Sequence, residues 1–328
     1  MKAAASRTKE LKQDPRTVEM RAQLAQRIGT ITAGVEGQYA STVPGLSLYR
    51  RTEPSPCNPA TYEPNLVVFV QGQKRINLGK TTHLCDEKSF LLTSVDLPVV
   101  SQVVTATRLK PLLGLTLKLE MAEVRRLLSQ DDFAEFGRSA EFAAVPEPCG
   151  ACGMAVGETG VELLSACLRL IDLLDAPQDI PFLSSLIQRE IVYRLLRSPQ
   201  GRHLRAIATL GEQSHRTAKA VGWLRMNYAK PLRIEELADM AQMGVSTLHH
   251  HFRSMTAMSP LQYQKQLRLH TARERMLSDG LDAASAAYEV GYESASQFSR
   301  EYSRFFGQPP MRDVKAQREA ITRETRFE

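Results

Sequence analysis

Two stretches of the sequence, offset by 50 residues, each place hydrogen-bond donors and cations on one side of an expected helix. In the first stretch the outward side chains are Ser246, Thr247, His249, His250 and Arg253. In the second they are Ser296, Gln297, Ser299, Arg300 and Arg304, with Glu301 as the one acid among them. Donors and cations are what phosphate oxygens and base edges require, so this chemistry suits contact with a nucleic acid.

The opposite side of each stretch is apolar. Leu248, Phe252 and Met255 correspond to Phe298, Tyr302 and Phe305, and the i, i+4, i+7 spacing predicts a buried stripe. The segments just before them also repeat, with an offset of 49: Leu237–Ala241 resembles Ala286–Val290. We therefore expect two copies of the same helical unit.

The links between the two helices of each copy also match. Each contains a glycine turn, Met243-Gly244-Val245 or Gly291-Tyr292-Glu293, and then a serine (Ser246, Ser294) suited to cap the next helix. The copies end on Ser259-Pro260 and Pro309-Pro310, where proline stops a helix. A short helix, a turn and a capped second helix predict two helix-turn-helix units. An ordinary helical bundle with a solvated face explains one copy as well, but not two with the same core spacing.

In a helix-turn-helix unit the second helix enters the major groove, which is about 12 Å wide and admits one helix. Arg253 and Arg304 come late in their helices and suit phosphates, together with Thr247 and Ser299. His249, His250, Gln297 and Arg300 are better placed for bases, and Arg300 suits a bidentate contact to guanine. His249–His251 do not predict a metal site, since neighbouring helical positions point about 100° apart.

Composition narrows the class of protein. The chain has 328 residues, 43% of them hydrophobic, and a net charge of +6. Residues 216–328 hold 17 Lys and Arg against 13 Asp and Glu, which is +4 of that excess. The longest apolar run, Leu66–Val70, has five residues, far short of the roughly 20 in a transmembrane helix. No secretory signal starts the chain, so we expect a soluble cytoplasmic protein without membrane contact.

The sequence pattern of the N-terminal half predicts β-strands. The expected ones are Asn65–Val70, Arg75–Leu78, Ser89–Thr93, Val99–Val104 and Leu112–Leu119, with Glu53–Pro64 as a proline-rich loop. Short strands separated by turns predict a small barrel or sandwich. Helices are expected at Met121–Leu128, Val161–Asp175 and Ile180–Arg197, and Val145–Gly160 reads as a linker.

The fold class expected is α+β. We predict a disordered segment at 1–17, a sensing domain at 18–160, a helical connector at 161–213, a helical DNA-binding domain at 214–315 and a tail at 316–328. The connector helices are expected to pack on the barrel or to dimerise.

The C-terminal third resembles the AraC/XylS family of bacterial transcription regulators. The segments that carry the resemblance are Leu237–Ala241, Leu248–Phe252, Ser259–Tyr263, Val290–Ser294, Phe298–Arg300 and Phe305–Pro310. The resemblance implies seven helices, a long linking helix at about 260–279, and base contacts from Ser246, His249, His250, Ser296, Gln297 and Arg300. The second unit departs from the family pattern, since its first helix is rich in alanine and lacks the usual isoleucine.

The N-terminal part is similar to the cupin-like sensor domain of one AraC branch. The matching segments are Pro64–Leu66, Gln71–Lys74 and Leu91–Val99. Metal cupins need several histidines, and residues 40–200 hold only His83. We therefore expect a ligand-binding pocket, with no catalytic residues, no metal and no cofactor.

The five cysteines raise a narrower question. Cys149 and Cys152 form a C-x-x-C in a Pro/Gly-rich segment, and Cys57 lies in the proline-rich loop. These three are candidates for a redox or electrophile switch. The alternatives are ordinary loop cysteines, or half of a zinc site that would need Cys57, Cys85 or Cys167 as further ligands. Cys167 lies on an apolar stripe and reads as core.

The hypothesis is a non-enzymatic, sequence-specific transcription regulator, favoured as an activator, that responds to a small-molecule effector or a thiol modification. Its expected partners are double-stranded operator DNA, RNA polymerase, an unknown effector and a second copy in a homodimer. Two alternatives are an architectural DNA binder without effector and a methyl-acceptor regulator that responds to DNA alkylation. The last needs four clustered N-terminal cysteines, and none precedes Cys57.

Overall fold

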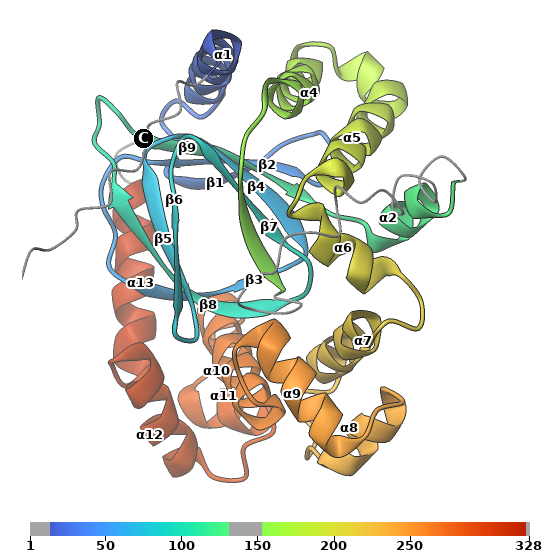
Figure 1. Cartoon of the computed structure of the whole chain (residues 1–328). Coiled ribbons are helices and arrows are strands. Elements are labelled where there is room, and N and C mark those ends of the chain that lie inside the picture. The colour runs from blue at the N-terminus through green and yellow to red at the C-terminus, as the bar shows by residue number, and fades with distance from the viewer. Residues whose placement is uncertain (1–13, 131–152, 326–328) are drawn as a thin grey trace, which may run out of the picture.

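Two antiparallel sheets face each other and form a barrel-like sandwich in the N-terminal half (Figure 1). The computed structural model describes residues 14–130 and 153–325. The first sheet has the order β1-β2-β9-β4-β7-β10 and the second β3-β8-β5-β6. The strands are β1 Gly37–Ala40, β2 Leu46–Arg51, β3 Asn58–Tyr62, β4 Asn65–Gln71, β5 Gln73–Leu78, β6 Thr81–Cys85, β7 Ser89–Thr93, β8 Leu97–Thr105, β9 Leu112–Lys118 and β10 Met154–Glu158.

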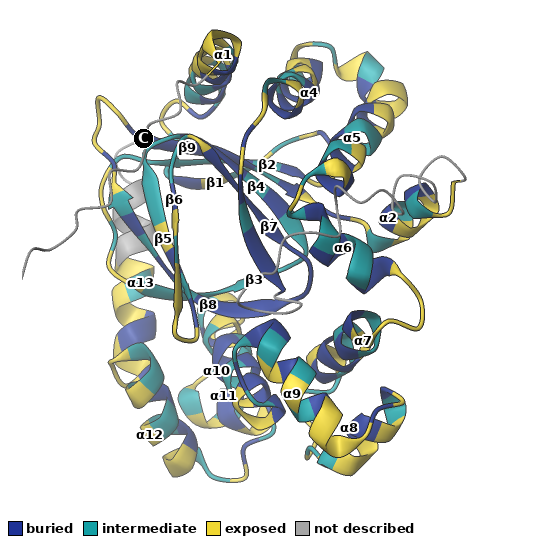
Figure 2. Cartoon of the chain, in the orientation of Figure 1, coloured by how far each residue is buried: buried dark blue, intermediate teal, exposed yellow. Residues whose placement is uncertain are grey.

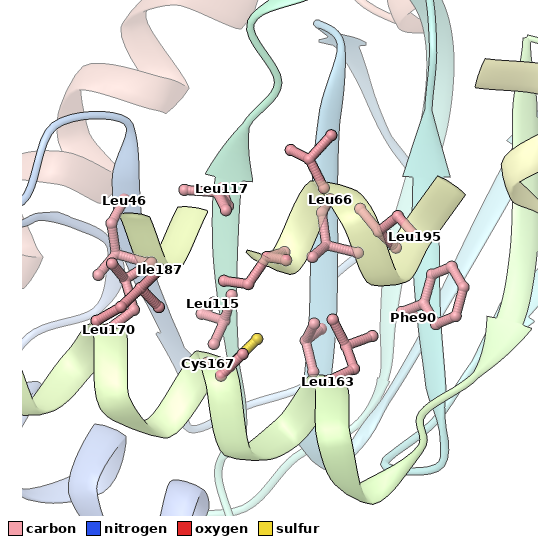
Figure 3. Close-up of a cluster of buried hydrophobic side chains, with 14 of the residues drawn as sticks. Leu46, Leu66, Phe90, Leu115, Leu117, Leu163, Cys167, Leu170, Ile187 and Leu195 are labelled. Atoms are coloured by element: carbon pink, nitrogen blue, oxygen red, sulfur yellow. The ribbon is translucent and has the colours of Figure 1, made fainter. Parts of the chain in front are cut away.

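The six-stranded sheet is covered on both faces, which explains its uninterrupted apolar runs. In β4 the side chains of Leu66, Val68 and Val70 point to helices on the outer face, whereas Val67 and Phe69 point to the barrel interior. The covering helices are α1 Pro15–Ile31, α4 Val161–Asp172 and α5 Ile180–Arg197. Figure 3 shows Leu163, Cys167 and Leu170 of α4 against this face of the sheet.

Two strands lie where the sequence predicted a loop and a linker, and both predictions are wrong. Strand β3 falls inside the expected loop Glu53–Pro64, and β10 inside the expected linker Val145–Gly160. Each is an edge strand, and Pro59 of β3 is tolerated there because an edge strand leaves one side unpaired.

The two ends of the chain are more helical than expected. Helix α1 begins at Pro15, with the Asp14 side chain accepting from the Arg16 amide, so disorder through residue 17 is wrong for the last residues of that stretch. At the other end, α13 spans Pro310–Thr325 and runs well into the expected tail.

The helices between the sheets and the C-terminal domain largely follow the prediction. Helices α2 Met121–Leu128 and α5 have the predicted bounds. The expected helix Val161–Asp175 is α-helical only to Asp172 and continues as the 3-10 turn η2, Leu173–Asp175. A second 3-10 turn, η3 Pro177–Asp179, and helix α6 Gly201–Ala208 complete this region.

Seven helices of the described chain follow α6, the number that the family resemblance implied. They are α7 Gln213–Met226, α8 Ile234–Met240, α9 Val245–Thr256, α10 Pro260–Ser278, α11 Ala283–Glu289, α12 Ala295–Phe306 and α13. Figure 2 shows exposed residues alternating with buried and half-buried ones along α8 and α12. The α+β fold class is confirmed. Within the described residues, no helix is long and apolar enough to cross a membrane.

Candidate nucleic-acid interface

The same backbone turn links α8 to α9 and α11 to α12. After α8, Gln242 adopts a left-handed conformation (φ 54°) and the Met243 amide donates to the Ala238 carbonyl at 2.9 Å. After α11, Gly291 is left-handed (φ 89°) and the Tyr292 amide donates to the Ala287 carbonyl, also at 2.9 Å. Every one of these positions is offset by 49 residues, so the structure contains two copies of one turn.

This repeat corrects the glycine alignment of the sequence analysis. The residue equivalent to Gly291 is Gln242, not Gly244, which is the N-cap of α9. The second copy requires glycine, because a Cβ atom on Gly291 would lie 2.0 Å from the Ala229 carbonyl oxygen. Gln242 adopts the left-handed φ with a side chain in place, so the first copy tolerates a residue other than glycine.

Of the two serines predicted to cap the second helices, one does so and the other does not. Ser294 is the N-cap of α12, and its hydroxyl accepts from the Gln297 amide at 3.3 Å, as predicted. Ser246 lies inside α9, and Gly244 caps that helix without a side-chain bond, so the prediction for Ser246 is wrong. Ser246 is therefore equivalent to Ser296, and both are exposed near the start of their helices.

An arginine holds the carbonyl of each left-handed residue. Arg216 of α7 donates to the Gln242 carbonyl at 3.1 Å, and Arg268 of α10 donates to the Gly291 carbonyl at 2.9 Å. Arg268 also donates to the carbonyls of Tyr228, Ala229 and Lys230, which form the loop after α7. Through Arg268, the long helix α10 fixes the second turn relative to the loop that precedes the first unit.

The predicted inner stripes are buried with one exception. Leu248, Phe252 and Met255 of α9 are fully buried, as are Phe298 and Tyr302 of α12, whereas Phe305 is half-buried. Helices α9 and α12 also end in the same way, on the left-handed residues Ala257 and Gly307. The predicted helix periodicity is therefore confirmed in both units.

The outer faces carry the residues that the sequence singled out. Eight of the ten are exposed: Ser246, Thr247, His250, Arg253, Ser296, Gln297, Arg300 and Arg304. His249 and Ser299 are half-buried. Each set lies on one helix, opposite its buried stripe, so the chain brings donors and cations together on two matched surfaces.

The single acid of the second face is neutralised by its neighbours. Glu301 accepts from Lys265 at 3.0 Å, from the Tyr292 hydroxyl at 2.9 Å and from Gln297 at 3.4 Å. Burial opposes the charge of Glu301, but these hydrogen bonds outweigh it and lower the pKa of the carboxyl. The carboxylate thus holds Gln297 in place rather than presenting a free negative charge.

The histidines of α9 lie in different surroundings. His250 is exposed and His251 half-buried, with their rings edge to face at 5.3 Å. Burial, followed by the neighbouring His250, lowers the pKa of His251. In the part of the chain that the structure describes, no three His, Cys, Asp or Glu side chains lie together as a metal site.

The cysteines fall into three groups. Cys149 and Cys152 lie outside the described residues. Cys57 is exposed, as expected from its loop position. Cys167 belongs to the core, as predicted, and Cys85 is also buried; burial raises the pKa of each thiol to about 12, which keeps both protonated and unreactive.

The first unit is docked on the barrel, which sequence reasoning did not predict. Arg225 of α7 donates to Asp96, between β7 and β8, and to Glu63, which follows β3. The Tyr263 hydroxyl of α10 donates to the Asp96 carbonyl at 2.7 Å, and the Gly153 amide donates to the Met255 carbonyl at 2.9 Å. Asp96 is 8% exposed; its burial outweighs Arg225 and raises the pKa of its carboxyl.

The two units differ in what surrounds their cores. Leu248, Phe252 and Met255 belong to one apolar cluster with barrel residues such as Leu97 and Val99. Phe298 and Tyr302 belong to a separate cluster within the helical domain. Only the first unit, among the described residues, shares its core with the sensor side of the molecule.

Comparison with known proteins places the chain in a family. A model of the N-terminus of AraC-type transcriptional regulators matches residues 42–203, and a helix-turn-helix domain model matches residues 237–315. The transcriptional activators RhaS of Yersinia pestis and Yersinia pseudotuberculosis are 29% identical over 157 residues, 48% of this chain. That match covers 55% of each relative, so the chain spans about half the length of the curated relatives it matches.

Solved structures of ToxT from Vibrio cholerae share the fold. The form with a bound unsaturated fatty acid has a TM-score of 0.54 at 11% identity, over 82% of this chain and 94% of ToxT. An apo form of a ToxT variant has a TM-score of 0.53 at 11% identity, over 84% and 98%. The class defined is a sensor sandwich joined to two helix-turn-helix units. The chain belongs to the AraC family of transcription regulators.

Proposed function

We propose that this protein is a sequence-specific, double-stranded-DNA-binding transcription regulator. The observation that carries this proposal is the repeated unit, with the same left-handed turn, the same buried stripe and the same exposed donors and cations in both copies. Two such helices suit successive major-groove segments on one side of a duplex. An architectural binder would not need the sensor domain.

The donors divide between bases and phosphates. Ser246, His249, His250, Ser296, Gln297 and Arg300 contact base edges. Thr247, Arg253, Ser299 and Arg304 contact phosphates. Gln297 is held by Glu301 in the free protein, which limits its conformations before it meets a base.

Genome-wide mapping of bound DNA, followed by gel-shift titration of the recovered sites, tests this function. The expected result is a shared sequence motif that competes at least about a hundredfold better than its scrambled form. Equal binding to both would leave only a non-specific binder, and absence of binding to either would refute the proposal.

The protein is cytoplasmic, and it activates transcription through contact with RNA polymerase. The relatives named as transcriptional activators support this direction. A reporter gene placed behind a mapped site tests it, with lower expression in a deletion strain as the expected result. Higher expression in that strain would make the protein a repressor.

The protein acts as a homodimer through α5. Phe182 is 76% exposed and Leu186 61% exposed, one turn apart on this helix, and Leu183 and Tyr193 are also exposed. A stripe of this kind is unfavourable in water and suits a helix of a second copy. The opposite side of α5 packs on the barrel core through Ile187, Ile191 and Leu195.

An effector in the sensor domain shifts the population between docked and released forms of the first unit. The contacts of Arg225 and Tyr263 with the barrel define the docked form. Cys149, Cys152 and Cys57 remain predicted as a thiol switch, and replacing the first two by serine should abolish a reporter response to oxidants or electrophiles. A full response in that double variant would refute the switch.

A further inference from the structure

The interior of the barrel contains a cavity of about 620 Å³, within the range of roughly 300–1,000 Å³ typical of small-molecule sites. Side chains that alternate inward on both sheets line it. Its walls include the apolar Val67 and Phe69 of β4, Gly114 of β9, and the phenols Tyr49 and Tyr62. Polar side chains such as Ser47, Thr61, Asn65 and Thr116 also line it, so the cavity offers both an apolar surface and groups that can orient a ligand.

Two lysines lie in the wall of this cavity, Lys74 of β5 and Lys118 of β9. The Lys118 amine is paired with Glu63 at 3.8 Å and its side chain is more than half exposed, whereas Lys74 has no such partner in the part of the chain that the structure describes. The Lys74 Nζ atom is 4.9 Å from the ring centre of Tyr49 and 5.6 Å from that of Tyr62, within cation–π range. No carboxylate of the described residues lies within 4 Å of this amine. Burial favours the neutral amine, but the phenols of Tyr62 and Tyr49 outweigh it and raise the pKa of Lys74.

Resting on the proposed function, we propose that the effector is a small organic carboxylate whose anionic group pairs with Lys74 and whose apolar part fills the barrel. A charged amine held by two rings, without a carboxylate partner, is satisfied by a ligand that brings one. Because Glu63 already pairs with Lys118, Lys74 is left to meet a single negative charge, which suits a carboxylate better than a phosphate dianion.

The same cavity reaches the contact that docks the first unit. Glu63 lines the cavity directly after Tyr62, and Glu63 is one of the two carboxylates bound by Arg225. An anion seated beside Tyr62 adds negative charge next to Glu63 and displaces the end of β3. The ligand thereby changes the docking of α7.

Calorimetric titration of the full-length protein with phenylbutyrate and octanoate, each beside its neutral primary amide, tests the ligand class. We expect both acids to bind and the amides to bind at least about tenfold more weakly. Lys74→Met should remove this preference and Lys74→Arg should keep it. Lys80→Met, at an exposed position in the turn after β5, is the matched control and should bind as the wild type does.

Several results would overturn the inference: no binding of either acid, equal binding of acids and amides, or full acid binding by Lys74→Met. If Lys74→Met fails to fold in a melting experiment, loss of acid preference in Lys74→Gln decides instead. DNA binding is measured on the same samples without ligand. Retained DNA binding with no acid preference refutes only the ligand class, whereas lost DNA binding in the wild type refutes the proposed function.

The coupling has its own test. Glu63→Gln should bind octanoate at least as tightly as the wild type does, because it removes a negative charge beside the ligand. In the wild type octanoate should change the DNA affinity in a gel shift, and in Glu63→Gln that change should vanish. An undiminished effect in Glu63→Gln would exclude this residue from the coupling.

Discussion

Arg225 on the first helix of the DNA-binding domain donates to Asp96 on the barrel, 129 residues earlier in the chain. Asp96 is nearly buried, and its backbone carbonyl also accepts from Tyr263. One residue of the sensor therefore binds α7 with its side chain and α10 with its backbone. Loss of this contact is expected to free the first helix-turn-helix unit without disturbing the core of the second.

Replacing Arg225 by Gln tests that contact. We expect the amides of residues 213–226 and 255–263 to exchange about fivefold faster, equivalent to roughly 1 kcal/mol for a partly exposed charged pair. Hydrogen exchange with mass spectrometry measures this. Arg233→Gln is the control, since Arg233 pairs with Glu236 on the exposed start of α8 and should leave both segments unchanged. Unchanged exchange in Arg225→Gln would show that apolar packing alone holds the unit.

Replacing Arg300 or Arg304 by Ala is expected to change DNA binding in different ways. Arg300→Ala should weaken binding to the mapped site by about 1–3 kcal/mol and relax its sequence preference, because it removes a base contact. Arg304→Ala should weaken all DNA alike and make log K about one unit less steep against log salt. Gel-shift series at several salt concentrations measure both. An Arg300→Ala variant with unchanged preference would remove this residue from the base-contact set.

The left-handed positions allow a matched set of substitutions. Gly291→Ala should destabilise by at least about 2 kcal/mol, since a methyl group meets the Ala229 carbonyl and the left-handed backbone is strained as well. Gly307→Ala has open space around it and should cost only about 1 kcal/mol. Gln242→Gly should stabilise slightly or not at all. Urea unfolding measures all three, and equal losses at 291 and 307 would contradict the clash.

Sequence reasoning located the local features of the site and missed the long-range ones. The stripes through Phe252 and Phe298 follow helix periodicity, which a single segment displays. Asp96 and Arg225 meet only through the packing of two domains, and no local pattern marks either residue. Strand β3 was missed because its proline is a loop signal that an edge position overrides.

The left-handed Gln242 was missed for a related reason. Glycine is the sequence signal for positive φ, so Gly244 was matched with Gly291. The residue with the equivalent backbone conformation is Gln242, two positions earlier. The cavity around Lys74 was also out of reach, because it depends on which strand faces point inward. Once the sheet order is known, alternation along β4 and β9 assigns those faces directly.

The proposed dimer predicts a change of mass on disrupting α5. A double variant, Phe182→Glu with Leu186→Glu, should be monomeric in analytical ultracentrifugation, because it places charges in the apolar stripe. Leu210→Glu changes an equally exposed apolar residue outside α5 and should remain dimeric. A monomeric wild type, or a dimeric double variant, would refute α5 as the interface.

His270 predicts a pH dependence of stability. This residue of α10 is 7% exposed, with its ring 5.4 Å from that of Phe305 and 5.7 Å from that of Phe306. Burial, with a smaller effect of the Arg273 charge, lowers the pKa of His270 to about 4. In the unfolded chain the imidazole titrates near pH 6.5, so the folded state excludes a proton that the unfolded state binds.

The stability contributed by neutral His270 is therefore complete above about pH 6.5 and is lost as the pH falls from about 6.5 towards 4. At pH 5 the loss is about 2 kcal/mol, from 1.36 kcal/mol per pH unit. Urea unfolding of wild type and His270→Phe at about pH 7.5 and pH 5 isolates this effect, since other titrating groups act in both proteins. Between about pH 7.5 and pH 5, the wild type should lose about 2 kcal/mol more unfolding free energy than His270→Phe does. Equal losses in the two proteins would show that His270 titrates normally.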